Sequence, residues 1–462
     1  MIVMKFGGSS IADADRIRHV ASIVEAQVKR KPALVLSAMG DTTDHLLAAA
    51  DTAIKTGMVS IGNIEELHAK TIQELRLSEA IEEGLQQEIT PLLDELRSLL
   101  VGISLIKELT NKTEDYLVSF GERLSVRIAA AYFNTIHIKA QAFDAWDMGF
   151  LSDANFSSAW LLKESWDLIP AKMLPVIESG ILPVVTGFIA REKSGAITTL
   201  GRGGSDLTAT VIAVACKAEE VQVWKDVDGI LTADPRLVPE AKPLEEVTYE
   251  EAAEMAYFGA QVLHPRAMQP CAKTGTPVLV KNSYNPRAPG TRILRFVPKK
   301  GPIRAITTRK NVTLIDIVST RMLGQYGFLE KVFSIFAKFG ISVDVVATSE
   351  VSVSVTLDAA NDLNTVEAEL SQIATVEVKK GRAIVTIIGD VNRSSEILQR
   401  AFGVCENLDV QVQMISQGAS KVNISFIVND TQADDVVRGL HRNFFGEPHE
   451  DPYKNSERDK RK

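Results

Sequence analysis

Short apolar runs alternate with amphipathic stretches through the first two thirds of the chain. Residues 2–6 are an apolar run that predicts a strand, residues 17–28 place apolar side chains at helical spacing, and residues 33–36 return to a strand. The same order of strand, helix and strand recurs at 181–188, 207–217 and 221–224. This order predicts an α/β fold in which a mainly parallel sheet is sandwiched by helices.

A helical region interrupts the alternation between about residues 56 and 124, where leucines recur at helical spacing. Prolines and glycines then concentrate between residues 284 and 304, and such residues break regular structure. We therefore predict a first domain over residues 1–295, followed by a boundary.

Two copies of a small βαββαβ unit are predicted after this boundary, each an antiparallel sheet with both helices on one face. The first copy has strands at 312–318, 342–347, 351–357 and 376–379 and helices at 328–339 and 363–373. The second has strands at 383–388, 410–416 and 422–428 and helices at 395–408 and 433–444. Its last strand is missing, so another part of the chain is a candidate to supply it. The predicted domains are 305–380 and 381–446, and we expect the charged tail over 447–462 to be disordered.

The composition argues against several classes of protein. The 51 basic and 59 acidic residues give a net charge of -8, which argues against binding to nucleic acid or to an anionic membrane. The three cysteines are too few and too scattered for a disulfide framework or a metal site. No span of about 18 residues lacks charge and no signal-peptide pattern opens the chain, so we expect a cytoplasmic protein.

The strongest candidate for chemistry is the run GRGGSD at residues 201–206, which precedes a predicted helix. Three glycines let backbone N–H groups turn inward, the helix N-terminus adds its positive end, and Arg202 brings a forked charge. Such a loop suits a phosphate group. The alternative is a tight turn in which Asp206 only caps the helix. The run contains neither GxxxxGK[ST] nor a complete GxGxxG fingerprint.

A second glycine pair lies in the run KFGGSS at residues 5–10, directly after the first strand. Sites in such sheets lie at the carboxyl ends of the strands, so we expect both glycine loops to face one crevice, with Lys5 directed at a terminal phosphate. The run WKDVDGILTADPR at 224–236 follows another strand, and its Lys225 and Arg236 suit a nucleotide. An ordinary surface turn is the alternative for each run taken alone.

Six runs of residues, in their order along the chain, resemble aspartate kinases. They are KFGGSS at 5–10, VLSAMGDTTD at 35–44, SFGERLS at 119–125, TTLGRGGSDLTA at 198–209, VWKDVDGILTADPR at 223–236 and EMAYFGAQVLHP at 254–265. The two small C-terminal units resemble the ACT domains of these enzymes, so the resemblance covers nearly the whole chain. It implies an amino-acid-kinase fold and phosphorylation of the side-chain carboxylate of aspartate by MgATP, on the route to lysine, threonine and methionine.

The resemblance also implies roles for individual residues. Those implied in phosphoryl transfer are Lys5, Arg202 and Asp206. Those implied to hold aspartate are Ser37, Thr43, Glu122 and Arg202. Of these, Glu122 is expected to bind the ammonium group and Arg202 a carboxylate. Those implied to line the nucleotide are Lys5, Gly7, Gly8, Ser9, Gly203, Gly204, Lys225, Asp226, Leu231, Arg236 and Gln261. Many relatives carry lysine at the position of Gln261 and an aromatic residue at that of Leu231. We interpret His264 as structural and assign no residue to a metal.

The first ACT-like unit resembles the effector site of lysine-inhibited aspartate kinases. The residues implied to bind the effector are Met322, Gln325, Phe328, Leu329, Ser342, Val343, Asp344, Thr348, Ser349 and Glu350. Asp344 offers a carboxylate for an amino group, and a solvated turn is the alternative. In the family such units pair between subunits, so the resemblance implies a homodimer or a higher homo-oligomer that responds to lysine.

Three functions stay open on the sequence alone. The first is an allosteric aspartate kinase, the second an amino-acid-sensing protein with an inactive kinase domain, and the third a related kinase acting on glutamate or a carbamate. For the first, no general base is required, because a carboxylate with a reference pKa of about 3.9 is ionised at neutral pH. Catalysis then reduces to alignment and charge neutralisation by Lys5, the loop amides and Mg²⁺.

Overall fold

The computed structural model describes residues 1–257, 263–298, 301–319, 326–358, 363–417 and 422–446. The chain forms two compact units. The first comprises Met1–Ile230, Pro243–Ala253 and Val262–Val297. The second comprises Leu231–Lys242, Glu254–Gln261 and Pro298–Lys462. The tail that was expected to be disordered, residues 447–462, lies outside the described residues.

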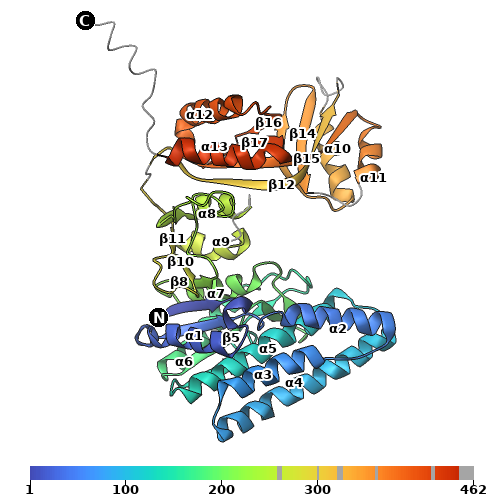
Figure 1. The fold of residues 1–462 in the computed structure, drawn as a ribbon. Helices are drawn as coiled ribbons and strands as arrows, with labels where there is room; N and C mark the ends of the chain where they lie inside the picture. The colour runs from blue at the N-terminus through green and yellow to red at the C-terminus, as the bar shows by residue number, and fades with distance from the viewer. Residues whose placement is uncertain (258–262, 299–300, 320–325, 359–362, 418–421, 447–462) are drawn as a thin grey trace, which may run out of the picture. The chain divides into compact units, whose positions relative to one another are not determined.

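An eight-stranded sheet with the strand order β3-β5-β2-β1-β8-β10-β11-β9 forms the centre of the first unit (Figure 1). Its strands are β1 (Ile2–Phe6), β2 (Pro32–Leu36), β3 (Ala140–Phe143), β5 (Leu182–Thr186), β8 (Val221–Lys225), β9 (Glu246–Thr248), β10 (Val278–Asn282) and β11 (Thr291–Leu294). Only the pair β10–β11 is antiparallel. The predicted mainly parallel sheet is therefore confirmed, and a small second sheet of β4 (Leu151–Ser152), β6 (Ile189–Glu192) and β7 (Ile197–Thr199) lies beside it.

All residues of the neighbouring strands β1 and β2 are buried, so both faces of the large sheet are covered there, and the first unit contains eight helices that lie wholly within its described residues. They are α1 (Ala14–Glu25), α2 (Thr42–Thr56), α3 (Gly62–Leu75), α4 (Glu79–Ile106), α5 (Asn111–Thr135), α6 (Ser165–Glu178), α7 (Gly204–Ala215) and α9 (Pro265–Thr274). A further helix, α8 (Tyr249–Tyr257), begins in the first unit and ends in the second. The helical region predicted between residues 56 and 124 corresponds to α3, α4 and most of α5. None of the described helices has both the length and the apolar character needed to cross a membrane.

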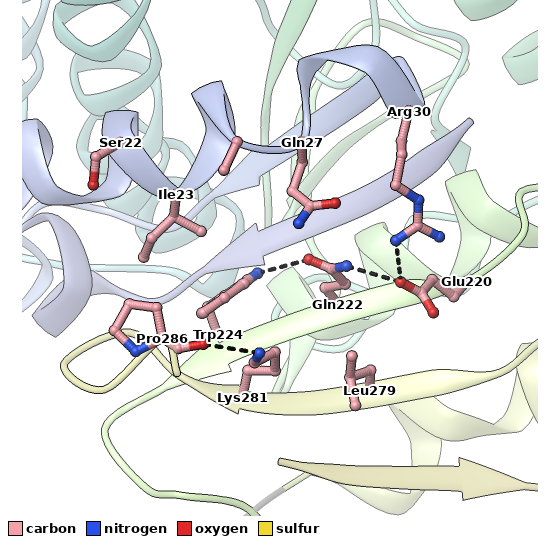
Figure 2. Close-up of a pocket in the computed structure, with 11 residues that line it drawn as sticks. Ser22, Ile23, Gln27, Arg30, Glu220, Gln222, Trp224, Leu279, Lys281 and Pro286 are labelled. Carbon is pink, nitrogen blue, oxygen red and sulfur yellow. Dashed lines mark hydrogen bonds and ion pairs between the residues drawn. The ribbon is translucent and has the colours of Figure 1, made fainter. Parts of the chain in front are cut away.

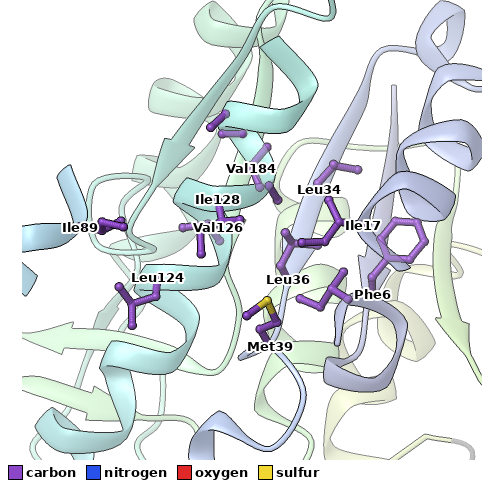
Figure 3. Packing of buried hydrophobic residues seen from close by; sticks show 14 of the residues in the cluster. Phe6, Ile17, Leu34, Leu36, Met39, Ile89, Leu124, Val126, Ile128 and Val184 are labelled. Carbon is purple, nitrogen blue, oxygen red and sulfur yellow. The ribbon is translucent and has the colours of Figure 1, made fainter. Parts of the chain in front are cut away.

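The main core lies between the sheet and helices α1, α3, α4 and α5 (Figure 3). All five residues of β1 are buried, because this strand lies in the middle of the sheet and is covered on both faces. Phe6 and Leu36 belong to the same buried cluster as Ile17 of α1 and Leu124 of α5, and Figure 3 shows Phe6 beside Ile17. This packing fixes the carboxyl ends of β1 and β2, at residues 6 and 36.

The second unit contains one six-stranded antiparallel sheet in the order β13-β14-β12-β15-β17-β16. Its strands are β12 (Ile303–Val318), β13 (Val343–Thr348), β14 (Ser352–Asp358), β15 (Thr375–Gly389), β16 (Met414–Ser416) and β17 (Asn423–Asn429). Its helices are α10 (Phe328–Lys338), α11 (Leu363–Leu370), α12 (Ser394–Asn407) and α13 (Ala433–Phe445). The strand predicted at 410–416 is correct only for its last three residues.

Two long strands serve both ACT-like repeats of this unit. In β12, residues 312–318 pair with β14, while residues 303–309 pair with the second half of β15. A register shift between Arg309 and Val312 separates the two halves. Residues 303–309 therefore supply the strand that the second copy lacks. Residues 303 and 304 lie in the predicted break between domains, and residues 305–309 lie at the start of the predicted first ACT-like unit.

A short segment of the predicted nucleotide loop belongs to the second unit. Ala233 and Val238 are buried in the same core cluster as residues of α12 and α13. The amide of Ile306 donates to the carbonyl oxygen of Thr232 at 2.8 Å, and the Thr232 hydroxyl lies 2.9 Å from the ring of His441. Residues 231–242 thus fold with the ACT-like repeats and not with the strand that precedes them.

Candidate active site

A cleft of about 800 Å³ opens at the carboxyl ends of the parallel strands of the first unit. Lys5 lies near the end of β1, Ser37 directly follows β2, and Lys225 ends β8. The residues that line the cleft are Lys5, Gly8, Ser37, Ala38, Gly40, Thr43, Asp44, Leu47, Glu114, Asp115, Val118, Glu122, Ser157, Phe188, Thr199, Gly201, Arg202, Gly203, Gly204, Ser205 and Asp206. The two glycine loops therefore face one crevice, as the sequence predicted.

A buried cluster of charges lies at this cleft. The Lys5 Nζ atom is 2.8 Å from Asp206 Oδ1, and the Lys225 Nζ atom is 3.6 Å from Asp206 Oδ2. Burial alone would raise the pKa of Asp206, but the two ammonium groups together lower it. Burial also lowers the pKa of Lys225. Two lysines against one carboxylate leave a local excess of positive charge, which suits a phosphate.

The helix that follows the GRGGSD run begins earlier than residue 207, where the sequence predicted its start. Helix α7 begins at Gly204, so Ser205 and Asp206 lie in its first turn. Gly203 is the N-cap and has a φ of +74°, and a Cβ added there would lie 2.6 Å from the Cβ of His264. Asp206 makes no capping hydrogen bond, and its carboxylate is held by the lysines instead. The alternative in which Asp206 only caps the helix is therefore wrong.

The first glycine loop approaches the backbone after β2 closely. A Cβ on Gly8 would lie 2.7 Å from the carbonyl oxygen of Ala38, so no larger residue fits without movement. Gly7 lies beside the Lys5 ammonium group, since a Cβ there would be 3.6 Å from Nζ. Gly8 lines the cleft, whereas Gly7 and Ser9, which were predicted with it, do not.

The residues predicted to hold aspartate all line this cleft. The Ser37 hydroxyl donates to the Ser205 hydroxyl at 3.1 Å, which joins the end of β2 to the first turn of α7. Arg202 is exposed and makes no hydrogen bond or ion pair with any described residue, so its guanidinium is available to a ligand. Thr43 lies in the first turn of α2.

Glu122 is a buried carboxyl group in the middle of α5. One of its oxygens accepts a hydrogen bond from the amide of Ala38 at 3.1 Å, and the other has no hydrogen-bond partner among the described residues. Burial raises the pKa of Glu122 to about 8, although the Ala38 amide and Lys5 act in the opposite direction. A cation that entered the cleft would find an unsatisfied carboxyl oxygen there.

The structure adds residues that sequence reasoning missed. Asp115, Phe188, Thr199 and Ser205 line the cleft with the predicted residues. Thr199 and Ser205 lie inside the TTLGRGGSDLTA run, so the resemblance of that run to aspartate kinases could have indicated them. Phe188 has a φ of +69°, a strained value that sequence alone does not reveal. Asp115 lies on α5 without any local motif around it.

Besides Gly7 and Ser9, four of the described residues that were predicted to line the nucleotide do not line the cleft: Lys225, which contacts Asp206, and Asp226, Leu231 and Arg236. Asp226 is exposed in the turn after β8. Leu231 and Arg236 belong to the second unit, and Arg236 is paired with its neighbour Asp234 at 2.7 Å. Gln261 lies outside the described residues. The role of each in nucleotide binding stays a prediction.

The acidic residues of the cleft do not form a dedicated metal cage. Among the described residues no group of three or more His, Cys, Asp or Glu side chains is arranged to hold a metal ion. Asp206 is held by Lys5 and Lys225, and Asp115 accepts three hydrogen bonds. This donor set fits a magnesium ion that arrives on nucleotide phosphates and keeps water ligands, which is the usual mode for Mg²⁺.

A second cavity of about 400 Å³ lies on the opposite face of β8 (Figure 2). There Trp224 Nε1 donates to the Gln222 side-chain oxygen at 3.2 Å, Gln222 donates to Glu220 at 2.8 Å, and Arg30 donates to Glu220 at 2.8 Å. These polar groups bind one another, so the chain of hydrogen bonds ties β8 to the end of the helical turn Val28–Arg30. We assign it a structural role.

The predicted effector residues are described in part. Met322 and Gln325 lie outside the described residues. Phe328 is buried at the start of α10, whereas Leu329, Ser342, Thr348, Ser349 and Glu350 are exposed. Val343 and Asp344 begin β13. The Asp344 carboxylate accepts a hydrogen bond from the Tyr257 hydroxyl at 2.8 Å and lies 3.2 Å from Arg309.

Comparisons with known proteins agree with this geometry. Residues 1–282 match the amino acid kinase family, and residues 385–444 match an ACT domain. The fold, the cleft and these matches define the class of the protein as an amino acid kinase with an ACT-containing regulatory unit.

Individual relatives narrow the class. Aspartokinase 1, chloroplastic, of Arabidopsis thaliana is 50% identical over 461 residues, covering 96% of this chain and 80% of the relative. Lysine-sensitive aspartokinase 3 of Escherichia coli is 36% identical over 458 residues, covering 96% of this chain and 99% of the relative. The chain belongs to the aspartokinase family. It is an aspartate kinase, a phosphotransferase of amino-acid biosynthesis with a carboxyl group as acceptor.

Two solved structures resemble this one over most of its length. Escherichia coli aspartokinase III in complex with aspartate and ADP, described as the R-state, superposes with a TM-score of 0.82, at 36% identity and with 96% of this chain and 100% of that chain covered. The same enzyme with lysine and aspartate, described as the T-state, gives a TM-score of 0.79, again at 36% identity, with 96% and 99% covered. The predicted family and fold class are thus confirmed.

Proposed function

We propose that this enzyme transfers the terminal phosphoryl group of ATP to the side-chain carboxylate of L-aspartate, with the cleft residues in the following roles. Lys5 and the N-terminal amides of α7 stabilise the transferring phosphoryl group, and Asp206 orients Lys5. Arg202 binds a carboxylate of aspartate, and Glu122 binds its ammonium group. The observation that carries this proposal is the buried cluster of Lys5, Asp206 and Lys225 beneath two glycine loops.

Proton chemistry is not needed for this transfer. The acceptor carboxylate is already ionised at neutral pH, so the protein has only to align it with the phosphorus and to neutralise charge. A magnesium ion bound to the ATP phosphates supplies further charge neutralisation. The Lys5 ammonium group is held by Asp206 before substrate arrives, so it needs little reorganisation during the reaction.

A panel of acceptors tests the proposal against its two alternatives. We expect ATP consumption with L-aspartate, and at least about a hundredfold lower kcat/KM with L-glutamate or carbamate, because Glu122 would anchor the amino acid at a set distance from the GRGGSD run and so favour one length of side chain. A higher kcat/KM with glutamate or carbamate would assign the enzyme to that acceptor. No consumption with any acceptor would favour the sensing protein with an inactive kinase domain.

We further propose that L-lysine inhibits the enzyme by binding at the first ACT-like repeat. Asp344 is nearly buried, with 5% of its side chain exposed, and it already binds the guanidinium of Arg309. Burial raises the pKa of Asp344, and Arg309 and the Tyr257 hydroxyl act in the opposite direction. The Asp344 Oδ2 atom makes no hydrogen bond with a described residue, so it can accept one from a further cation. The ammonium group of lysine is such a cation. The similarity to a lysine-sensitive enzyme supports the same conclusion.

Replacing Asp344 is expected to weaken the lysine response. In the Asp344→Ala variant, the lysine concentration for half-inhibition should rise by about tenfold or more, the loss typical of one hydrogen bond to a charged group. Asp358→Asn is the matched control, because Asp358 also pairs with Arg309 but is 71% exposed. Inhibition by lysine that is equal in both variants, or absent from the parent enzyme, would contradict this site.

Two further proposals concern the oligomeric state and the location of the enzyme. We propose that copies of the chain pair through their ACT-like repeats, as the resemblance implies. We also propose a cytoplasmic location, which is supported by three buried free cysteines, Cys216, Cys271 and Cys405, as expected in a reducing compartment.

A further inference from the structure

Arg266, the second residue of α9, holds two segments of the first unit at once. Its guanidinium donates to the carbonyl oxygen of Leu200 at 2.9 Å and to that of Ala159 at 2.6 Å. It also donates to the Ser158 hydroxyl at 3.0 Å and lies 4.1 Å from the centre of the Trp160 ring. One side chain thus joins the residues just before the phosphate loop to a loop around residue 159.

Asp115, on α5, holds the neighbouring residues of the same two segments. Its carboxylate accepts hydrogen bonds from the amides of Ser157 and Thr199, both at 2.9 Å, and from the Thr199 hydroxyl at 2.7 Å. Only 2% of Asp115 is exposed. Burial raises the pKa of Asp115, while these three donors favour the ionised form. Both of its oxygens are engaged by the protein, Oδ2 by two amides and Oδ1 by a hydroxyl, so the carboxylate is held against these two segments.

The two charged groups act on one structural element. The amide of Ala159 donates to the carbonyl oxygen of Thr199 at 2.9 Å, so the two segments are bonded to each other between Asp115 and Arg266. Gly201 follows with a φ of +72°, and a Cβ there would lie 3.1 Å from the carbonyl oxygen of Ser157. The start of the GRGGSD run therefore has little freedom to move.

We propose that Asp115 and Arg266 are positioning residues for phosphoryl transfer, which fix residues 199–201 so that Arg202 and the first turn of α7 face the substrates. The physical reason is that the loop amides stabilise the transition state only if they are held in place before the reaction. This inference rests on the role proposed above for the GRGGSD run, and it extends that role to two residues that bind the run from outside.

Removing the guanidinium tests the proposal. We expect kcat of the Arg266→Ala variant to fall by about tenfold to a hundredfold, since a displacement of about 1 Å has an effect of that size. Arg97→Ala is the matched control, because Arg97 forms ion pairs with Glu65 and Asp94 on helices α3 and α4 away from the cleft. Its kcat should stay within about twofold of the parent.

Chemical rescue separates positioning from mere stability. Millimolar guanidinium chloride should restore part of kcat in Arg266→Ala, and sodium chloride of equal ionic strength should not, because only the planar cation can donate to both carbonyl oxygens. Arg266→Lys, which keeps the charge but loses the fork, should stay impaired. If Arg266→Ala kept the kcat of the parent and only melted at a lower temperature, the proposal would be wrong.

A double variant tests whether the two residues act on the same element. Asp115→Asn alone should lower kcat, and its combination with Arg266→Ala should lower kcat by less than the product of the two single effects, because the segments are already released. Independent, multiplicative losses would overturn the shared role. If Asp115→Asn does not fold, the rescue of Arg266→Ala decides the question. Activity of the parent with aspartate keeps these outcomes separate from a failure of the proposed reaction.

Discussion

Replacement of Lys5 by methionine is expected to lower kcat for aspartate phosphorylation by about a thousandfold, the loss seen when a fixed donor to the transition state is removed. Methionine keeps the length of the side chain and removes the charge. The ammonium group is buried and lies 2.8 Å from Asp206, so water cannot take its place without moving the cluster. Steady-state kinetics with saturating ATP and aspartate measure the effect.

The Lys5→Met variant should also be less stable, because the carboxylate of Asp206 loses its nearest cation. Without Lys5, Asp206 retains only Lys225 at 3.6 Å, so burial should raise the pKa of the carboxyl. The variant should then unfold at a lower temperature than the parent at neutral pH and recover in Lys5→Met/Asp206→Asn, which removes the unpaired charge. Lys55→Met, on the exposed surface of α2, is the control. A Lys5→Met enzyme with unchanged kcat would remove Lys5 from the mechanism.

Replacement of Glu122 by glutamine is expected to raise KM for aspartate by about a hundredfold, because a charged partner of the ammonium group is lost from a buried site. The effect on kcat should be smaller, since Glu122 does not face the transferring phosphoryl group in the proposed arrangement. The measurement is initial rate against aspartate concentration at saturating ATP. Equal losses in kcat and KM would place Glu122 elsewhere in the mechanism.

The pH dependence of aspartate binding follows from the same residue. The pKa of Glu122 is raised to about 8, so below this pH the empty enzyme holds a proton that must leave before the ammonium group binds. KM for aspartate should therefore fall as pH rises from about 6 to 8 in the parent. The Glu122→Gln variant has no such proton, and its KM should stay flat over that range.

The stability of the empty enzyme should fall over the same pH range in which its affinity for aspartate rises. Between the unfolded value of 4.5 and the folded value of about 8, the folded protein holds a proton on Glu122 that the unfolded chain has released. The favourable contribution of this group is complete below the unfolded pKa and is lost as pH rises through the folded pKa. The parent should therefore lose more stability than Glu122→Gln between about pH 5 and pH 8.

The local features of this protein were predictable from its sequence. The buried strand at residues 2–6 and the helix after it follow from an apolar run and from helical spacing, which depend only on near neighbours. Both glycine loops were predicted from short runs of glycine beside charged residues, which also depend only on near neighbours. Their meeting at one cleft followed from a general rule about parallel sheets, because the carboxyl ends of the strands share one edge.

Functional residues that lie outside any recognisable motif could not be predicted from the sequence. Asp115 is bonded to Thr199 across 84 positions of the chain, and nothing near Asp115 in the sequence indicates that partner. Arg266 likewise binds the carbonyl oxygen of Leu200, a group that every residue possesses. Sequence reasoning weighs side-chain types and spacing, so a bond from a side chain to a distant backbone atom leaves no pattern.

By itself, the amino-acid sequence determined the class of fold, the positions of the two glycine loops and, through its six runs, the family. Only the tertiary structure decided that residues 303–309 complete the second ACT-like repeat and that residues 231–242 fold with that repeat. It also decided that Asp206 binds two lysines and does not cap its helix. The physical reason is that strand pairing and burial join segments far apart in the chain, and periodicity reports only the face that each segment presents.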